Sequence, residues 1–102
     1  IPSLTSATTN RITGTVTGNA GDVYRIQYFK TSSESAANGL YAQGDTYIGY
    51  QDVTIGGSSA TLDFDLSAKG IIAGDVITAT ATLLSSGTPS QSSSFSNGIR
   101  VT

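Results

Sequence analysis

The segment between Ser58 and Leu84 alternates apolar and polar side chains twice, with the period of a β-strand. The apolar positions of the two series are Ala60, Leu62, Phe64 and Leu66, and then Ile77, Ala79, Ala81 and Leu83. Residues two apart share one face of a strand, whereas an amphipathic helix repeats its apolar positions every three or four residues. The pattern therefore predicts two half-buried strands that face one core, with the intervening threonines exposed to solvent.

Short alternating segments and turns rich in Gly, Ser and Asn account for most of the remaining chain. We expect seven strands, over residues 3–8, 11–17, 23–31, 47–55, 58–67, 75–84 and 94–102. The strand over 23–31 is expected to be central, with Tyr24, Ile26 and Tyr28 toward the core and Phe29 on the other face. A turn around Pro89 is expected over residues 85–92.

Two details concern the strand over 47–55. Its apolar residues change parity, with Ile48 and Tyr50 on one face and the later apolar residues on the other, which indicates a β-bulge at Gly49 or Gln51. After it, Gly56 and Gly57 predict a tight hairpin into the strand over 58–67, because glycine adopts a positive φ readily.

With no helical segment to connect parallel neighbours, this pattern favours an all-β, two-sheet antiparallel sandwich, with a small closed β-barrel as the alternative. A chain of 102 residues is long enough for one domain with one core, over residues 1–102. A net charge of −2 is too small for a disordered chain. Because Ile1 is preceded by neither Met nor a signal peptide, we expect a domain excised from a longer multidomain protein.

Composition excludes several partners. The five cationic residues are scattered and make no basic patch, which argues against nucleic acid. No apolar run approaches the roughly 18 residues that a membrane span requires. Without cysteine, stability must come from the core and the strand ladders, and we expect the isolated domain to be a monomer.

Several segments are similar to an immunoglobulin-like repeat module of large secreted or cell-surface bacterial proteins. They are Pro2–Ala7, GLYAQGDTYIG at 39–49, the strand over 58–66, AGDVITATAT at 73–82, and Ser94–Ser96. Such modules occur in tandem, often beside β-helix domains. Family members often carry a cysteine pair in the long loop and a polar Asp/Gly turn after the sixth strand. Here the loop has no cysteine, and residues 83–87 replace that turn.

The resemblance implies a seven-stranded Greek-key immunoglobulin-like sandwich that works as a non-catalytic spacer in an extracellular, adhesin-like protein. Its partners would be neighbouring modules of the same chain, and a glycan or surface protein. A spacer of this kind requires Ile1 and Thr102 at opposite ends of the domain.

Catalysis finds little support in the residue types. Without His or Cys, a nucleophile would have to be activated by a lysine, and the only nearby pair is Ser67 and Lys69 on a loop. Asp63 and Asp65 share one exposed face, about 7 Å apart, and could act as a carboxylate pair or as calcium ligands. A flat strand surface is not a cleft, so we expect no enzyme activity.

A calcium hypothesis comes from a repeated motif. Ala-Gly-Asp-Val precedes the third and sixth strands, which places Asp22 and Asp75 in equivalent turns. Calcium prefers clustered carboxylate and carbonyl oxygens. Antiparallel strands put these turns at opposite poles, which excludes one shared site. Either pole could instead share an ion with a neighbouring module through Asp45 or Asp52; otherwise each Asp caps its own turn.

The long stretch from Ser32 to Thr46 has no period and is a candidate functional loop. Tyr41, Tyr47 and Tyr50 lie in it or next to it and are the candidate ligand-binding residues. Exposed aromatic rings stack on sugars or protein ligands. The alternative is that these tyrosines pack the loop against the sandwich.

Overall fold

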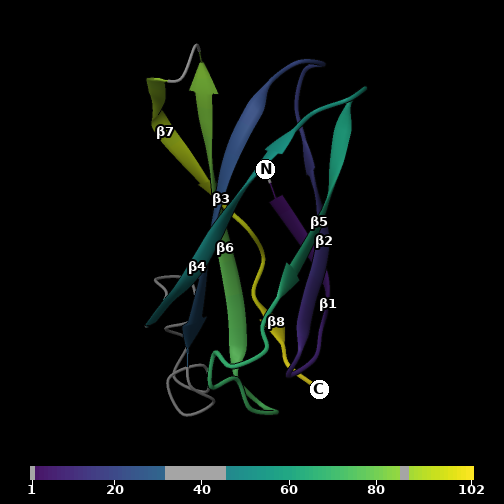
Figure 1. Cartoon of the computed structure of the whole chain (residues 1–102), viewed down its shortest axis with the longest axis vertical. Helices are drawn as coiled ribbons and strands as arrows, with labels where there is room; N and C mark the ends of the chain where they lie inside the picture. The colour runs from purple at the N-terminus through teal and green to yellow at the C-terminus, as the bar shows by residue number, and fades with distance from the viewer. Residues whose placement is uncertain (1, 32–45, 86–87) are drawn as a thin grey trace.

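All regular structure in the described part of the chain is β-strand (Figure 1). The computed structural model describes residues 2–31, 46–85 and 88–102, with the backbone alone for residues 85 and 88–95. The strands are β1 (Pro2–Ala7), β2 (Arg11–Thr17), β3 (Val23–Thr31), β4 (Thr46–Thr54), β5 (Ser59–Asp65), β6 (Val76–Ser85), β7 (Thr88–Phe95) and β8 (Ile99–Arg100). No helix among these residues is long and apolar enough to cross a membrane.

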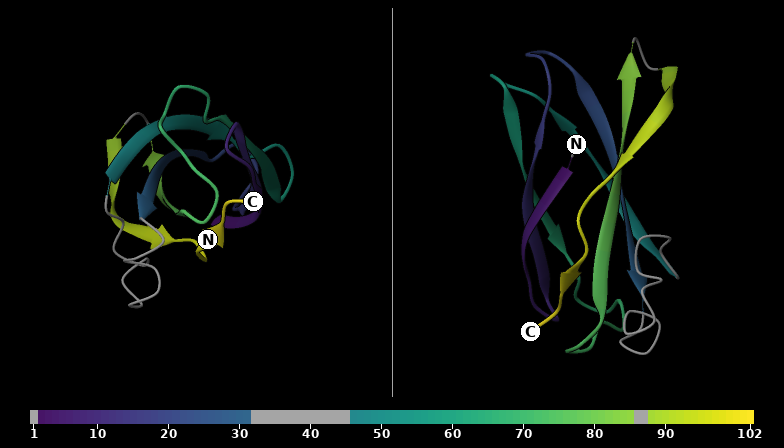
Figure 2. Two further views of the ribbon diagram at one scale, coloured as in Figure 1. Left: turned by 90° about the horizontal axis from the view of Figure 1, so that it is seen from below. Right: turned by 180° about the vertical axis from the view of Figure 1, so that it is seen from behind.

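The strands form two antiparallel sheets, as expected for a sandwich. One sheet has the order β1-β2-β5, and the other has the order β4-β3-β6-β7, with β8 also paired to β6. Figure 2 shows the sheets curving around a common interior. Within the described residues the ladders remain two separate sheets and do not join into one closed barrel.

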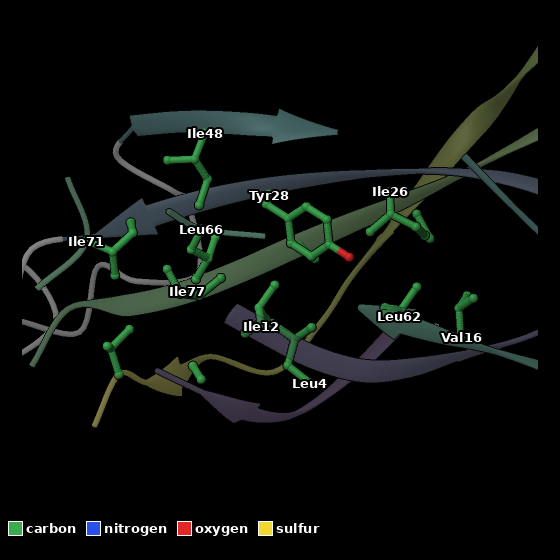
Figure 3. Packing of buried hydrophobic residues seen from close by; sticks show 14 of the residues in the cluster. Leu4, Ile12, Val16, Ile26, Tyr28, Ile48, Leu62, Leu66, Ile71 and Ile77 are labelled. Carbon is green, nitrogen blue, oxygen red and sulfur yellow. The ribbon is translucent and has the colours of Figure 1, made fainter. Parts of the chain in front are cut away.

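The core lies between the sheets and is built from the residues that the alternation selects (Figure 3). Leu62, Ile77 and Ala79 are fully buried, and Phe64 is half-buried against them. Tyr28 is the largest fully buried side chain. Its ring stacks on Phe64 with centroids 4.4 Å apart, and its hydroxyl donates to Gln51 Oε1 at 2.5 Å. The predicted inward faces of the strands over 23–31, 58–67 and 75–84 are therefore confirmed.

Exposure of the threonines, in contrast, is wrongly predicted on β6. Thr78 and Thr80 are buried, as is Thr31 on the neighbouring strand β3. They belong to the outward parity, but β6 lies inside its sheet, with β3 on one side and β7 and β8 on the other. The Thr31 and Thr78 hydroxyl oxygens are buried and have no hydrogen-bond partner among the described residues.

The bulge predicted at Gly49 or Gln51 is present at Gly49. Tyr28 pairs with Gly49 but Phe29 pairs with Tyr47, so Ile48 is the extra residue of β4. Gly49 has a φ of 141°, which favours glycine. Because the extra residue reverses the parity, Ile48 is buried while Tyr50 is exposed. The prediction that Ile48 and Tyr50 share a face is wrong for this reason.

The predicted hairpin between β4 and β5 does not form. β4 pairs with β3 and β5 pairs with β2, so the chain changes sheets at Gly56 and Gly57, neither of which has a positive φ. Backbone hydrogen bonds hold the connection to the β2–β3 turn: the Ile55 N–H donates to the Asp22 oxygen at 2.8 Å, and the Gly18 N–H donates to the Ser58 oxygen at 3.1 Å.

The C-terminal part also differs from the prediction of one strand over 94–102. β7 begins at Thr88 and ends at Phe95, and β8 follows at Ile99, which gives eight described strands in place of seven. Phe95 pairs with Thr80 and Ile99 with Ile77, so this segment has one residue more than β6 between the two pairs. Such an insertion interrupts a ladder. Pro89 fits β7 because β7 is an edge strand.

Candidate functional site

An aromatic surface occupies the outward face of β3 and β4. It consists of Phe29, Tyr47 and Tyr50. The two tyrosines are 51% and 53% exposed, which makes them, with Ile72, the exposed large hydrophobic residues of the described chain. The β4 bulge produces this arrangement, because it turns Tyr50 outward on the same side as Tyr47.

The strand register orders this surface in three rows. Tyr47 pairs with Phe29, Tyr50 pairs with Gln27, and Asp52 pairs with Arg25. Successive rows lie about 7 Å apart along β3, since alternate residues of a strand share a face. The Tyr47 ring meets the Phe29 ring edge-on, with centroids 5.6 Å apart. Phe29, on the neighbouring strand β3, thus packs against the Tyr47 ring.

A charged pair ends the surface at its third row. Arg25 Nε donates to Asp52 Oδ1 at 2.9 Å and Nη2 donates to Oδ2 at 3.1 Å, a two-point contact. The hydrogen bond from Arg25 lowers the pKa of Asp52, and the same bond raises the pKa of Arg25. The Arg25 guanidinium also lies 4.7 Å from the centroid of the Tyr50 ring, a cation–π contact.

These groups are suited to binding and contain no nucleophile paired with a base. The rings offer apolar faces, while the amide of Gln27 and the Arg25–Asp52 pair offer hydrogen-bond donors and acceptors. Asp52 occupies two of the five N–H groups of Arg25. About two fifths of each charged side chain is exposed, at 40% for Arg25 and 39% for Asp52.

Sequence reasoning found part of this surface. Tyr47 and Tyr50 are brought together as predicted, whereas Tyr41 and Asp45 lie outside the described residues. Arg25 and Gln27 were missed as site residues. Their signal is the parity of β3: Arg25, Gln27 and Phe29 alternate with the core residues and so share one outward face.

The other candidate aspartates lie apart from one another. Asp22 Oδ2 accepts a hydrogen bond from the Asn19 N–H at 3.1 Å within the β2–β3 turn. Asp75 is buried before β6, where it accepts from the Ile72 N–H at 3.0 Å and lies 3.8 Å from Lys30 Nζ.

The β3–β6 ladder places these two aspartates at opposite poles, as predicted. Asp22 precedes Val23, which pairs with Leu84 at one end of the ladder. Asp75 precedes Val76, which pairs with Thr31 at the other end. Each caps its own turn, and Asp52 is held by Arg25. Among the residues that the structure describes, no three acidic side chains gather into a metal-binding group.

Asp63 and Asp65 likewise have separate partners. Asp63 Oδ1 accepts a hydrogen bond from Arg11 Nη1 across the β2–β5 ladder. Asp65 accepts from the Ser67 N–H at 2.8 Å, and this backbone hydrogen bond lowers its pKa. Each carboxylate therefore stabilises a local contact.

A second feature joins the two ends of the chain. Asn97 Oδ1 accepts from the Leu4 N–H at 2.9 Å, and Asn97 Nδ2 donates to the Leu4 oxygen at 3.0 Å. The Thr102 N–H and its hydroxyl both donate to the Ala7 oxygen, at 3.0 and 3.2 Å. We call these contacts, formed by Leu4, Ala7, Asn97 and Thr102, the terminal clasp.

Sequence reasoning missed Asn97 entirely. It lies between β7 and β8, where no alternation of apolar residues marks a position as structural. Its interaction depends on a strand that is far away in sequence.

Comparison of the chain with protein-family models and with curated proteins found no match.

Proposed function

We propose that this chain is an immunoglobulin-like, non-catalytic spacer module of a repetitive extracellular or cell-surface bacterial protein of the adhesin-like type. The distribution of strands supports the immunoglobulin-like assignment. The first, second and fifth strands share one sheet, and the third, sixth and seventh share the other. An immunoglobulin sandwich divides these strands in the same way, and β4, which pairs with β3, takes the place of the strand C′ that variable-type sandwiches add to this sheet.

The terminal clasp is the observation that carries the spacer role. From Leu4 to Ala7 the contacts of β1 advance along the C-terminal segment from Asn97 to Thr102, so the two segments run side by side in the same direction. Four hydrogen bonds thereby link the segments through which a tandem protein would be pulled.

Ile1 lies outside the described residues, and the start of β1 and Thr102 are separated along the long axis without reaching its two opposite ends (Figure 1). Thr102 lies at one pole of the long axis, beside the end of β1, whereas the start of β1 lies well away from that pole (Figure 1). The distance along β1 is about 17 Å at the usual rise per strand residue. The domain measures 39 × 24 × 20 Å, so the separation of its two ends is smaller than its longest dimension (Figure 1).

Tension between the two ends loads the clasp in shear. Two neighbouring segments that run in the same direction must slide past each other when their opposite ends are pulled, so their hydrogen bonds bear the load together. A contact of this kind resists force better than one in which bonds open singly. The clasp thus gives the sandwich a fixed length under load.

Force spectroscopy on a tandem array of this chain tests the proposal. We expect each module to unfold in one step, at a lower force in an array carrying Asn97→Ala than in the unmodified array. An array carrying Asn10→Ala, which changes an exposed turn residue outside the clasp, is the matched control and should unfold at the unmodified force. Equal unfolding forces in all three arrays would remove the mechanical basis of the spacer role.

A further inference from the structure

We propose that the aromatic surface on β3 and β4, together with Arg25, Gln27 and Asp52, binds a neutral pyranose sugar of a glycan. This inference goes beyond the spacer role and does not depend on it. It assigns a ligand class to the outward face of the five-stranded sheet, where the register brings all six side chains together.

The aromatic rings match the apolar face of a sugar. A pyranose ring presents C–H groups on its faces and hydroxyl groups around its rim, so it packs flat on an aromatic ring. The Phe29 and Tyr47 rings meet edge-to-face, and the guanidinium of Arg25 lies over one face of the Tyr50 ring, so a sugar would stack on the opposite face of Tyr50. Both rings are fixed by neighbours yet about half exposed, which lowers the entropy lost when a ligand binds.

The polar groups match the rim of the same sugar. Gln27 pairs with Tyr50, and the Arg25–Asp52 pair follows in the next row, about 7 Å away. A sugar stacked on Tyr50 would place its rim hydroxyls over these side chains. The amide, the guanidinium and the carboxylate supply both donors and acceptors, as neighbouring hydroxyl groups require.

The charge of the surface selects a neutral ligand. Arg25 and Asp52 form a two-point ion pair, so their charges cancel locally. Acidic sugars would meet no unpaired positive charge on these rows.

The composition of the surface favours a sugar over a protein. A stable protein interface covers about 800 Å² on each partner and has a core depleted of charge. Here three aromatic rings adjoin a charged pair, and Ile72, the remaining exposed large hydrophobic residue of the described chain, lies in the loop before β6. Among the described residues, Tyr47 and Tyr50 lie on successive rows about 7 Å apart, and each can stack one sugar ring.

A glycan array probed with the purified domain tests the inference. The probes are neutral and sialylated oligosaccharides on one array, and the strongest neutral binder is then titrated in solution against each variant. We expect neutral glycans to bind, at least tenfold weaker binding for Tyr50→Ala, and retained binding for Tyr50→Phe, which keeps the ring. Ile72→Ala removes an exposed apolar side chain elsewhere and should bind normally.

Tyr47→Ala provides a second, independent variant and should also bind at least tenfold more weakly. Circular dichroism and thermal melts identify variants that remain folded. The inference is overturned if the folded domain binds no neutral glycan up to millimolar concentration, if it binds only sialylated ones, or if both folded alanine variants bind as well as the unmodified domain. Unfolding forces in the tandem array would be unaffected by that outcome, which keeps the two proposals separable.

Discussion

The side chain of Asn97 forms hydrogen bonds to both backbone polar atoms of Leu4, at 2.9 and 3.0 Å. An amide group thus takes the place that a neighbouring strand would occupy along this part of β1. The position is significant because the β1–β2 ladder shifts its register between Leu4 and Ser6. Asn97 therefore fixes β1 next to its own irregularity and satisfies backbone groups at the edge of the smaller sheet.

Asn97→Ala should lower the free energy of unfolding by about 1–3 kcal/mol, because it leaves the partly buried N–H and oxygen of Leu4 without their partner. Urea denaturation measures this change. Asn97→Asp keeps the acceptor and loses the donor, so we expect a loss of stability for it as well. Asn10→Ala should change stability by less than about 0.5 kcal/mol. A loss of stability no larger for Asn97→Ala than for Asn10→Ala would contradict the role assigned to this contact.

Gly14→Ala should be strongly destabilising. A Cβ at residue 14 would lie 2.3 Å from the Ser3 backbone oxygen and 3.0 Å from the Leu4 Cα, so β1 would have to move away from β2. Overpacking of this kind typically costs about 1–3 kcal/mol, and here the obstacle is backbone. Gly56→Ala is the matched control, since its Cβ would meet no atom within 4 Å and its φ is not positive. Thermal melts of both variants distinguish steric crowding from a general cost of replacing glycine.

The fold was predictable wherever alternation was strong. The bounds of β2 and β3 agree with the expected 11–17 and 23–31, because the core-facing residues of each recur at every second position. β7 was missed because Thr88–Phe95 is rich in serine and carries no such pattern. The sheet change between β4 and β5 was missed because glycine marks a turn without specifying which strands pair across it.

The candidate site was only partly predictable for related reasons. Tyr47 and Tyr50 stood out as aromatic residues, but the position of the bulge decides which way Tyr50 faces, and the sequence allowed it at Gly49 or Gln51. Arg25 and Asp52 come from two strands whose register sets their contact. Composition did not identify that pair.

Arg25→Gln should reduce the acid sensitivity of the domain. The hydrogen bond from Arg25 lowers the pKa of Asp52 below its value of about 3.9 in an unfolded chain. The stability that this pair contributes is therefore fully present above pH 4 and is lost as the pH falls through the folded-state pKa. Urea denaturation between pH 5 and pH 2 should show a shallower loss for Arg25→Gln. About two fifths of each paired side chain is exposed, so the difference should shrink further at high salt. Parallel pH profiles for the two proteins would rule out this contribution.

Tyr28→Phe should remove an alkaline loss of stability. Burial in the core raises the pKa of Tyr28, and the negative charge of Asp63 adds to this effect. In the unfolded chain the phenol ionises near pH 10, whereas in the folded domain it stays neutral to higher pH. The stability from the neutral phenol is therefore complete below pH 10 and is lost as the pH rises toward the folded-state pKa, by up to about 1.4 kcal/mol per pH unit.

At neutral pH the same substitution should cost about 1 kcal/mol, because Gln51 Oε1 loses the hydrogen bond from the phenol. The two proteins should thus converge in stability between pH 10 and 11, and Tyr28→Phe should be the more stable one at higher pH. Urea denaturation across this range measures the crossing. Tyr47→Phe, which changes an exposed ring, should keep the alkaline loss of the unmodified domain. If Tyr28→Phe lost stability with rising pH as steeply as Tyr47→Phe, the buried phenol of Tyr28 would not be the source of the alkaline loss.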